Sequence, residues 1–200
     1  MNLPISPKLA LSLFFVGAAA LAATSIAVTA PATRAASDAA SATCTKRQVP
    51  GQPPKHTQNL KANGKWNSFP PSSGLHYELS AKFNWYSQPI PQIVVVHNLE
   101  HGGVAVSYGN RVAPATLAKI RSWYLKDTNG VLVTPLPKLG KRIALTAWNA
   151  PPYAGTNPDP GRGIVLMCSG FDAKAFSAFR AQHRYKAGER FPKPNLARQQ

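Results

Sequence analysis

Two patterns of apolar and polar positions meet in the middle of the chain, over residues 93–108. Residues 93–96 and 104–108 are mainly apolar and rich in β-branched side chains, a composition typical of buried strands. The insert between them, residues 97–103, is mostly polar and holds two histidines, an asparagine, a glutamate and two glycines. Because polar groups between core strands are costly to bury without partners, this insert predicts either a bound metal or a dense hydrogen-bond network.

The spacing of His97 and His101 limits how this insert can fold. In an extended strand, residues four apart are separated by roughly 13 Å, which is too far for one metal ion. In a helical turn their Cβ atoms lie about 5–6 Å apart, and Glu100 then joins the same face. Gly102 and Gly103 allow the chain to leave such a turn with a positive φ. We therefore expect a tight turn or bulge here, and a site shared by the two histidines depends on it.

Two helices are predicted in the second half of the chain. The first begins near Pro114, continues with apolar residues at helical spacing and ends at Asn129-Gly130. The second is capped by Asp172 and ends at Gly188. Its His183 is interpreted as a residue of the helix surface or the edge of the core.

Further strands are predicted at residues 131–134 and 143–148, while residues 164–168 form a fifth strand or lead into the last helix. The order is therefore strand, strand, helix, strand, strand, helix (ββαββα). The short connections predict antiparallel hairpins. The expected fold class is α+β: a two-layer sandwich in which an antiparallel sheet of about four strands carries helices on one face.

Three regions are expected along the 200 residues. Residues 1–43 predict a signal peptide or membrane anchor plus a linker, because Lys8 precedes a long apolar and alanine-rich run. Residues 44–190 form a single α+β domain that opens with a loop-like Pro/Gly segment, and residues 191–200 form a basic tail. The domain is therefore predicted to be extracytoplasmic: periplasmic, secreted or anchored by the N-terminal segment.

The chain has two cysteines, Cys44 and Cys168. In an exported protein an even number of cysteines favours a disulfide, which here would tie the start of the domain to its C-terminal third. The alternative makes Cys168 a metal ligand or a nucleophile.

The formal net charge is +16, with only seven carboxylates in the whole chain. Such a charge favours anionic surfaces, including those of the cell envelope. The chain has no run of five Lys or Arg and no zinc-finger or RNP-type motif, which argues against nucleic acid as the partner.

Histidine is the main chemical signal, because four of the five histidines lie outside apolar periodic segments. Imidazole is the commonest metal ligand in proteins, so we expect an exported metal-binding protein, with copper first and zinc second. His97 and His101 are the expected ligands, His76 and His56 complete the set, and Glu100 is either a ligand or an orienting partner.

Three other interpretations stay open. The polar turn can be a buried hydrogen-bonded turn without a metal. The histidines and Glu100 can serve an extracytoplasmic hydrolase, although the spacing is not that of the His-Glu-x-x-His metalloprotease motif. The positive charge can serve a non-catalytic adaptor at anionic envelope surfaces.

Three segments resemble motifs of a bacterial domain family of unknown function: residues 70–77, 96–104 and 144–148. The hallmark of that family is Val-His-Asn-Leu-Glu-His-Gly-Gly-Val, which residues 96–104 match throughout. The resemblance covers roughly residues 56–189 and implies an exported or membrane-anchored protein, but no established activity. The positions that it places in the family motifs are His56, His76, His97, Glu100 and His101.

Overall fold

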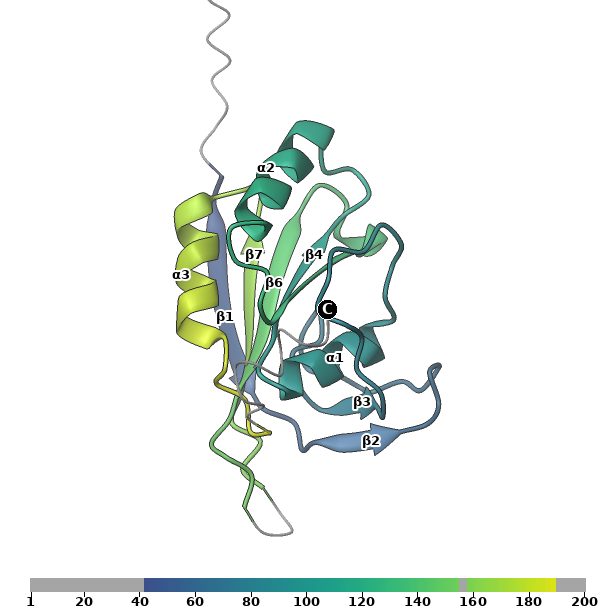
Figure 1. Ribbon diagram of the computed structural model, residues 1–200. Coiled ribbons are helices and arrows are strands. Elements are labelled where there is room, and N and C mark those ends of the chain that lie inside the picture. The colour runs from purple at the N-terminus through teal and green to yellow at the C-terminus, as the bar shows by residue number, and fades with distance from the viewer. Residues whose placement is uncertain (1–41, 155–157, 190–200) are drawn as a thin grey trace, which may run out of the picture. The chain divides into compact units, whose positions relative to one another are not determined.

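A five-stranded sheet forms the centre of the fold (Figure 1). The computed structural model describes residues 42–154 and 158–189, so most of the predicted signal peptide or anchor and all of the basic tail lie outside the described residues. In spatial order the strands are β1 (Cys44–Pro50), β7 (Arg162–Cys168), β6 (Ile143–Asn149), β4 (Val104–Tyr108) and β5 (Val131–Pro135). A separate pair, β2 (Lys55–Thr57) and β3 (Leu75–Tyr77), is parallel.

Strand pairing in the main sheet is antiparallel except at one edge. The helix α2 (Pro114–Tyr124) connects β4 to β5, and these two strands pair in parallel. A mixed α and β fold with a mostly antiparallel sheet is therefore confirmed. The predicted hairpin between β5 and β6 is wrong, because β6 pairs with β4 and β7 instead.

Two segments differ in type from the prediction. Residues 93–96, expected as a strand, belong to the helix α1 (Gln92–Glu100). This helix is buried on nearly every side, so its sequence lacks the polar face that gives a helix its period. The strand β1 lies in the segment expected to be a loop, and its pairing with β7 places it at the sheet edge.

The helices cover both faces of the sheet, not one as predicted (Figure 1). The helices α2 and α3 (Ala173–His183) pack on one face through aromatic and aliphatic side chains, among them Ile120, Trp123 and Phe176. The helix α1 packs on the other face through Val95, Val96 and Leu99, against Trp148 of β6 and Phe83. Alternate residues of β4 serve the two cores, as the pleat requires.

Two local predictions, a helix cap and a disulfide, are confirmed. The Asp172 carboxylate accepts a hydrogen bond from the Ala175 backbone N–H at 2.9 Å and so caps α3. Cys44 and Cys168 form a disulfide between β1 and β7. Such a bond is typical of an oxidising, extracytoplasmic environment, and it removes Cys168 as a metal ligand or nucleophile.

Among the described residues, no helix combines the length and apolar character needed to cross a membrane.

Candidate metal centre

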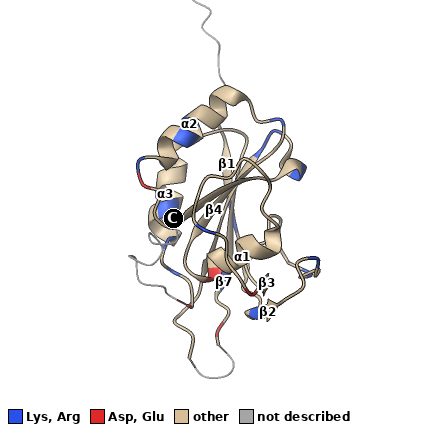
Figure 2. Cartoon of the chain, turned by 45° about the vertical axis from the view of Figure 1, so that its right-hand side comes forward, with Lys and Arg blue, Asp and Glu red and all other residues tan. Residues whose placement is uncertain are grey.

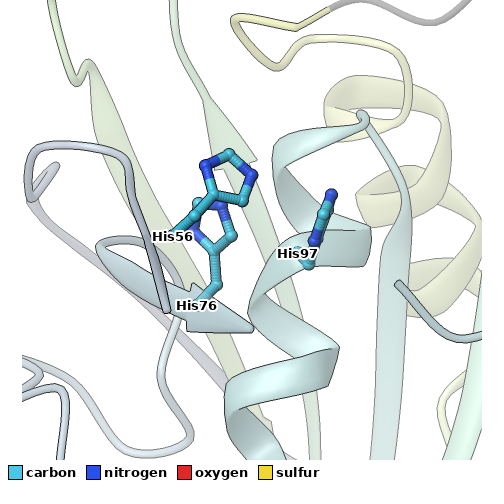
Figure 3. A group of neighbouring side chains, drawn as sticks. All are labelled: His56, His76 and His97. Carbon is cyan, nitrogen blue, oxygen red and sulfur yellow. The ribbon is translucent and has the colours of Figure 1, made fainter. Parts of the chain in front are cut away.

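The C-terminal half of α1 lies against the small sheet, and histidines from both elements meet there. His97 comes from α1, His76 from β3, and His56 from β2, where it pairs in register with His76. Figure 3 shows the three rings close together, and their centroids are 4.3–5.2 Å apart. The predicted tight turn is a helical turn, and the chain leaves it through Gly102 with a φ of +87°. The segment therefore forms the helical turn that a site shared by His97 and His101 requires.

Two of these rings are fixed by backbone carbonyls. His97 donates its Nδ1–H to the Tyr77 carbonyl at 2.6 Å, and His76 donates its Nδ1–H to the Gly74 carbonyl at 2.7 Å. In its neutral form, a ring held in this way presents the lone pair of Nε2. Histidines that bind metals usually show this arrangement, because the second hydrogen bond sets the tautomer and the ring orientation.

The Glu100 side chain is buried beside these rings. Its Oε2 lies 2.8 Å from His76 Nε2 and 3.7 Å from His56 Nε2, and its Oε1 accepts a hydrogen bond from the Tyr153 hydroxyl at 3.2 Å. A carboxylate oxygen and an imidazole lone pair are both acceptors. At 2.8 Å they require a shared proton or a cation between them.

A second group of acceptors lies on the other side of His97. His97 Nε2 is 2.8 Å from His101 Nε2, which is itself 2.8 Å from Glu189 Oε2. A single hydrogen on His101 Nε2 can point at only one of these two acceptors. Hydrogen-bond acceptors therefore face one another without enough hydrogens at two places in the cluster, between His76 and Glu100 and among His97, His101 and Glu189.

The side chains form two overlapping sets of possible ligands. The first set is His56, His76 and His97, the second is His97, His101 and Glu189, and the ligand atoms within each set lie within 4.8 Å of one another. Ligand atoms bound to one ion at 2.0–2.1 Å in tetrahedral geometry are about 3.4 Å apart. The widest pair of each set therefore needs to close by at most about 1.4 Å to bind an ion.

Burial dominates the electrostatics of this site. It lowers the pKa of His97 to about 4, helped by the neighbouring His101 and His76 and opposed by the bond to Tyr77. The hydrogen bond from His101 lowers the pKa of Glu189. His97 is therefore a neutral ring at ordinary pH, which is the form that binds metals.

The segment after α3 brings Glu189 to the site. Its backbone pairs with two loops: Tyr185 N–H donates to the Gly102 carbonyl at 2.8 Å, and Tyr153 N–H donates to the Gly188 carbonyl at 3.0 Å. A side chain at position 188 would collide with the Tyr153 ring, so glycine is needed there.

The structure brings together all five residues predicted from the sequence: His56, His76, His97, Glu100 and His101. Their role as ligands stays a prediction. Glu189 and Tyr153 were not predicted as site residues, since both lie in irregular segments; Glu189 stands at the end of the region that resembles the family. His183 lies apart from the cluster, against Phe179.

The positive charge does not gather at this site. Figure 2 shows Lys and Arg on α2, on α3 and on several connecting segments. The predicted affinity for anionic envelope surfaces stays a prediction.

Comparison with known proteins identifies a family. A model described as "Protein of unknown function (DUF3105)" matches residues 58–200, which leaves His56 and Cys44 just outside the matched region. No curated protein and no solved structure matches the chain.

Proposed function

We propose that this chain, which belongs to the DUF3105 family of proteins of unknown function, binds a divalent transition-metal ion between α1, β2 and β3. One observation carries the proposal. His76 and His97 are each held through Nδ1 by a backbone carbonyl, which leaves Nε2 for a ligand, and these Nε2 atoms lie 2.8 Å from the buried Glu100 carboxylate and 2.8 Å from His101 Nε2, respectively. A cation there would replace contacts between acceptors with ligand bonds.

The proposed ligands differ in burial. His76 and His97 are buried and are the fixed ligands, while the His56 side chain is half exposed and completes the set from the solvent side. Glu100 is a fourth ligand or orients His76. His97 Nε2 can bind only one ion, so His101 and Glu189 offer a second position for the same ion.

The donor atoms favour particular metals. All of them are imidazole nitrogens and carboxylate oxygens, which suit Cu²⁺ and Zn²⁺. The described sulfur atoms lie elsewhere, in the disulfide and in Met167. Met167 pairs with Ala144 of β6, whereas the β6 residue that contacts His76 is Trp148, four positions further along the strand. Soft Cu⁺ is therefore disfavoured. At one nitrogen and oxygen site Cu²⁺ binds more tightly than Zn²⁺, so copper comes first.

Metal titration of the purified protein tests this proposal. We expect one Cu²⁺ or Zn²⁺ per chain, and at least a 10–100-fold loss of affinity in His97→Ala and His76→Ala. His183→Ala is the matched control, since His183 is the one histidine outside the cluster, and it should bind normally. Elemental analysis of untagged protein prepared without chelators identifies the ion. Absence of stoichiometric binding, or equal binding by His97→Ala and the control, would refute the proposal.

A further inference from the structure

His97 belongs to both sets of possible ligands and offers each of them the same atom, Nε2, because its Nδ1 is bound to a backbone carbonyl. In the first set it stands with His56 and His76, whose rings lie on one side of the His97 ring (Figure 3). In the second set it stands with His101 and Glu189. An ion can therefore move from one set to the other without releasing His97.

A carboxylate accompanies each set, and the two carboxylates differ in exposure. Glu100, which lies beside the first set, extends from α1, and its side chain is 2% exposed. Glu189, a member of the second set, extends from the segment after α3, and its side chain is 39% exposed. Of these two carboxylates, Glu189 is therefore the one that can contact an ion and a partner from solution at the same time.

A route through Glu189 also keeps the ion in contact with a negative charge. A divalent cation that left the buried Glu100 by way of the half-exposed His56 would depend on neutral imidazoles alone. A cation that moves to the second set exchanges Glu100 for Glu189 and keeps an anionic neighbour. Because a charge without a counter-charge is costly inside a protein, the route through the second set has the lower barrier.

The distances suit a stepwise exchange of ligands. His101 Nε2 lies 2.8 Å from His97 Nε2 and 2.8 Å from Glu189 Oε2, so it stands between the shared ligand and the exposed carboxylate. A four-coordinate Zn²⁺ can add a fifth ligand before it releases one. Bonds to the other two histidines of the first set break as bonds to His101 and Glu189 form, and the oxidation state of the ion does not change. His101 binds in the neutral tautomer that carries its hydrogen on Nδ1, so no proton is lost overall.

The alternative role of the second set is structural. In that role the His101 Nε2–H donates to Glu189 and ties the segment after α3 to the end of α1. A structural tie needs only an acceptor at position 189, whereas a ligand that exchanges a divalent cation needs the negative charge. Glu189→Gln keeps an acceptor oxygen and removes the charge, so it separates the two roles.

We infer that the second set is a transfer position, through which the ion passes between the buried first set and an acceptor in solution. This inference rests on the proposed metal site. The chain is then a carrier that gives up its ion. Its partner is an acceptor whose nitrogen or oxygen ligands reach the ion beside Glu189.

Transfer of Zn²⁺ from the loaded full chain to a chromogenic chelator, followed by stopped-flow absorbance, tests the inference. Glu189→Gln should slow the transfer at least about tenfold, a larger factor than the change in its Kd, and should slow loading of the metal-free chain to a similar extent. His56→Ala should have the opposite effect and speed release, because it removes a ligand of the first set.

Glu78→Gln is the matched control, because Glu78 is exposed, directly follows β3 and belongs to neither set, while its replacement removes the same charge. It should transfer Zn²⁺ as the unaltered chain does. The inference is wrong, and the metal site stands, if Glu189→Gln transfers Zn²⁺ as fast as this control or loses as much affinity as His76→Ala. Absence of Zn²⁺ binding by the unaltered chain would instead refute the metal site, and the inference with it.

Discussion

Each face of the sheet buries a histidine near the C-terminal end of a helix, and the two histidines have different neighbours. His97 on α1 is 5% exposed, His183 on α3 is 6% exposed, and burial lowers the pKa of both to about 4. His183 meets the Phe179 ring and accepts a hydrogen bond from the Asn149 amide, whereas His97 meets other imidazoles and lies near Glu100. Burial and a lowered pKa therefore do not identify a site; the neighbours do.

The wider surroundings differ in the same way. The face covered by α2 and α3 is apolar and aromatic, and His183 is the one buried polar residue that these two helices contribute. On the other face, α1 and the residue after it contribute four buried polar residues, His97, Asn98, Glu100 and His101, and β3 adds His76. The face covered by α2 and α3 therefore contributes mainly to stability, whereas the burial of several hydrogen-bond acceptors beside α1 costs stability.

The largest effect is expected from Phe176→Ala. Its buried ring packs edge-on against Trp123 and Phe171, so its loss should lower the free energy of unfolding by about 3–5 kcal/mol. Metal affinity of the folded protein should not change. Leu99→Ala on α1 is the counterpart: denaturation should show a loss of about 2–5 kcal/mol, and titration a weaker metal site. Equal effects of the two variants on metal affinity would show that the metal site depends on both faces of the sheet.

Removal of the disulfide should come next. The variant with Cys44→Ala and Cys168→Ala should lose about 2–4 kcal/mol of unfolding free energy, because the unfolded chain is no longer cross-linked. The bond packs with the α2–α3 core, so stabilisation by metal should persist. Denaturation with and without Zn²⁺ measures both quantities, and loss of the metal effect would link the two faces.

Metal should stabilise the protein through the α1 face alone. At a free concentration of 100 times Kd, the free energy of unfolding should rise by about 2.7 kcal/mol. Thermal unfolding should show this rise in the unaltered chain and in His183→Ala, and show little or none in His97→Ala. A rise in His97→Ala equal to that of the unaltered chain would assign binding to other residues.

A pH dependence that both histidines share completes the comparison. Their pKa values are about 4 in the folded chain and about 6.5 in the unfolded chain, so the unfolded state takes up protons first as the pH falls. Stability should be highest above pH 6.5 and decline toward pH 4, with up to about 1.4 kcal/mol per pH unit for each histidine. Denaturation of His183→Gln across this range should show a shallower decline; an unchanged slope would contradict the burial of a neutral ring.

The sequence predicts those elements that show one side to solvent. The helices α2 and α3 were predicted because each has one buried and one exposed face. The helix α1 was mistaken for a strand because a short apolar run buried all round has no period. The strand β1 was missed because its side chains, Lys46 and Arg47 included, are mostly exposed at the sheet edge. Parallel pairing of β4 with β5 follows from the connection through α2; the helix itself was predicted, but the strands were assigned to antiparallel hairpins with their nearest neighbours in the sequence.

The candidate site was predictable where residues lie close in the sequence. The spacing of His97, Glu100 and His101 indicated a shared face once a helical turn formed. His56 and His76 were predicted because they lie outside apolar periodic segments, and the resemblance also includes them. Glu189 was not predictable by these means, because its position depends on how the chain runs after α3. Long-range geometry of this kind has no periodic signal.

Residues 185–188, whose backbone pairs with the loops after α1 and β6, come last among the segments that build the cluster. All the histidines of the cluster are synthesised before residue 102, whereas Glu189 leaves the ribosome much later. A nascent or truncated chain that ends before residue 189 therefore has every imidazole of the cluster but lacks the last carboxylate, so the second of the two proposed ion positions is complete only once residue 189 is present.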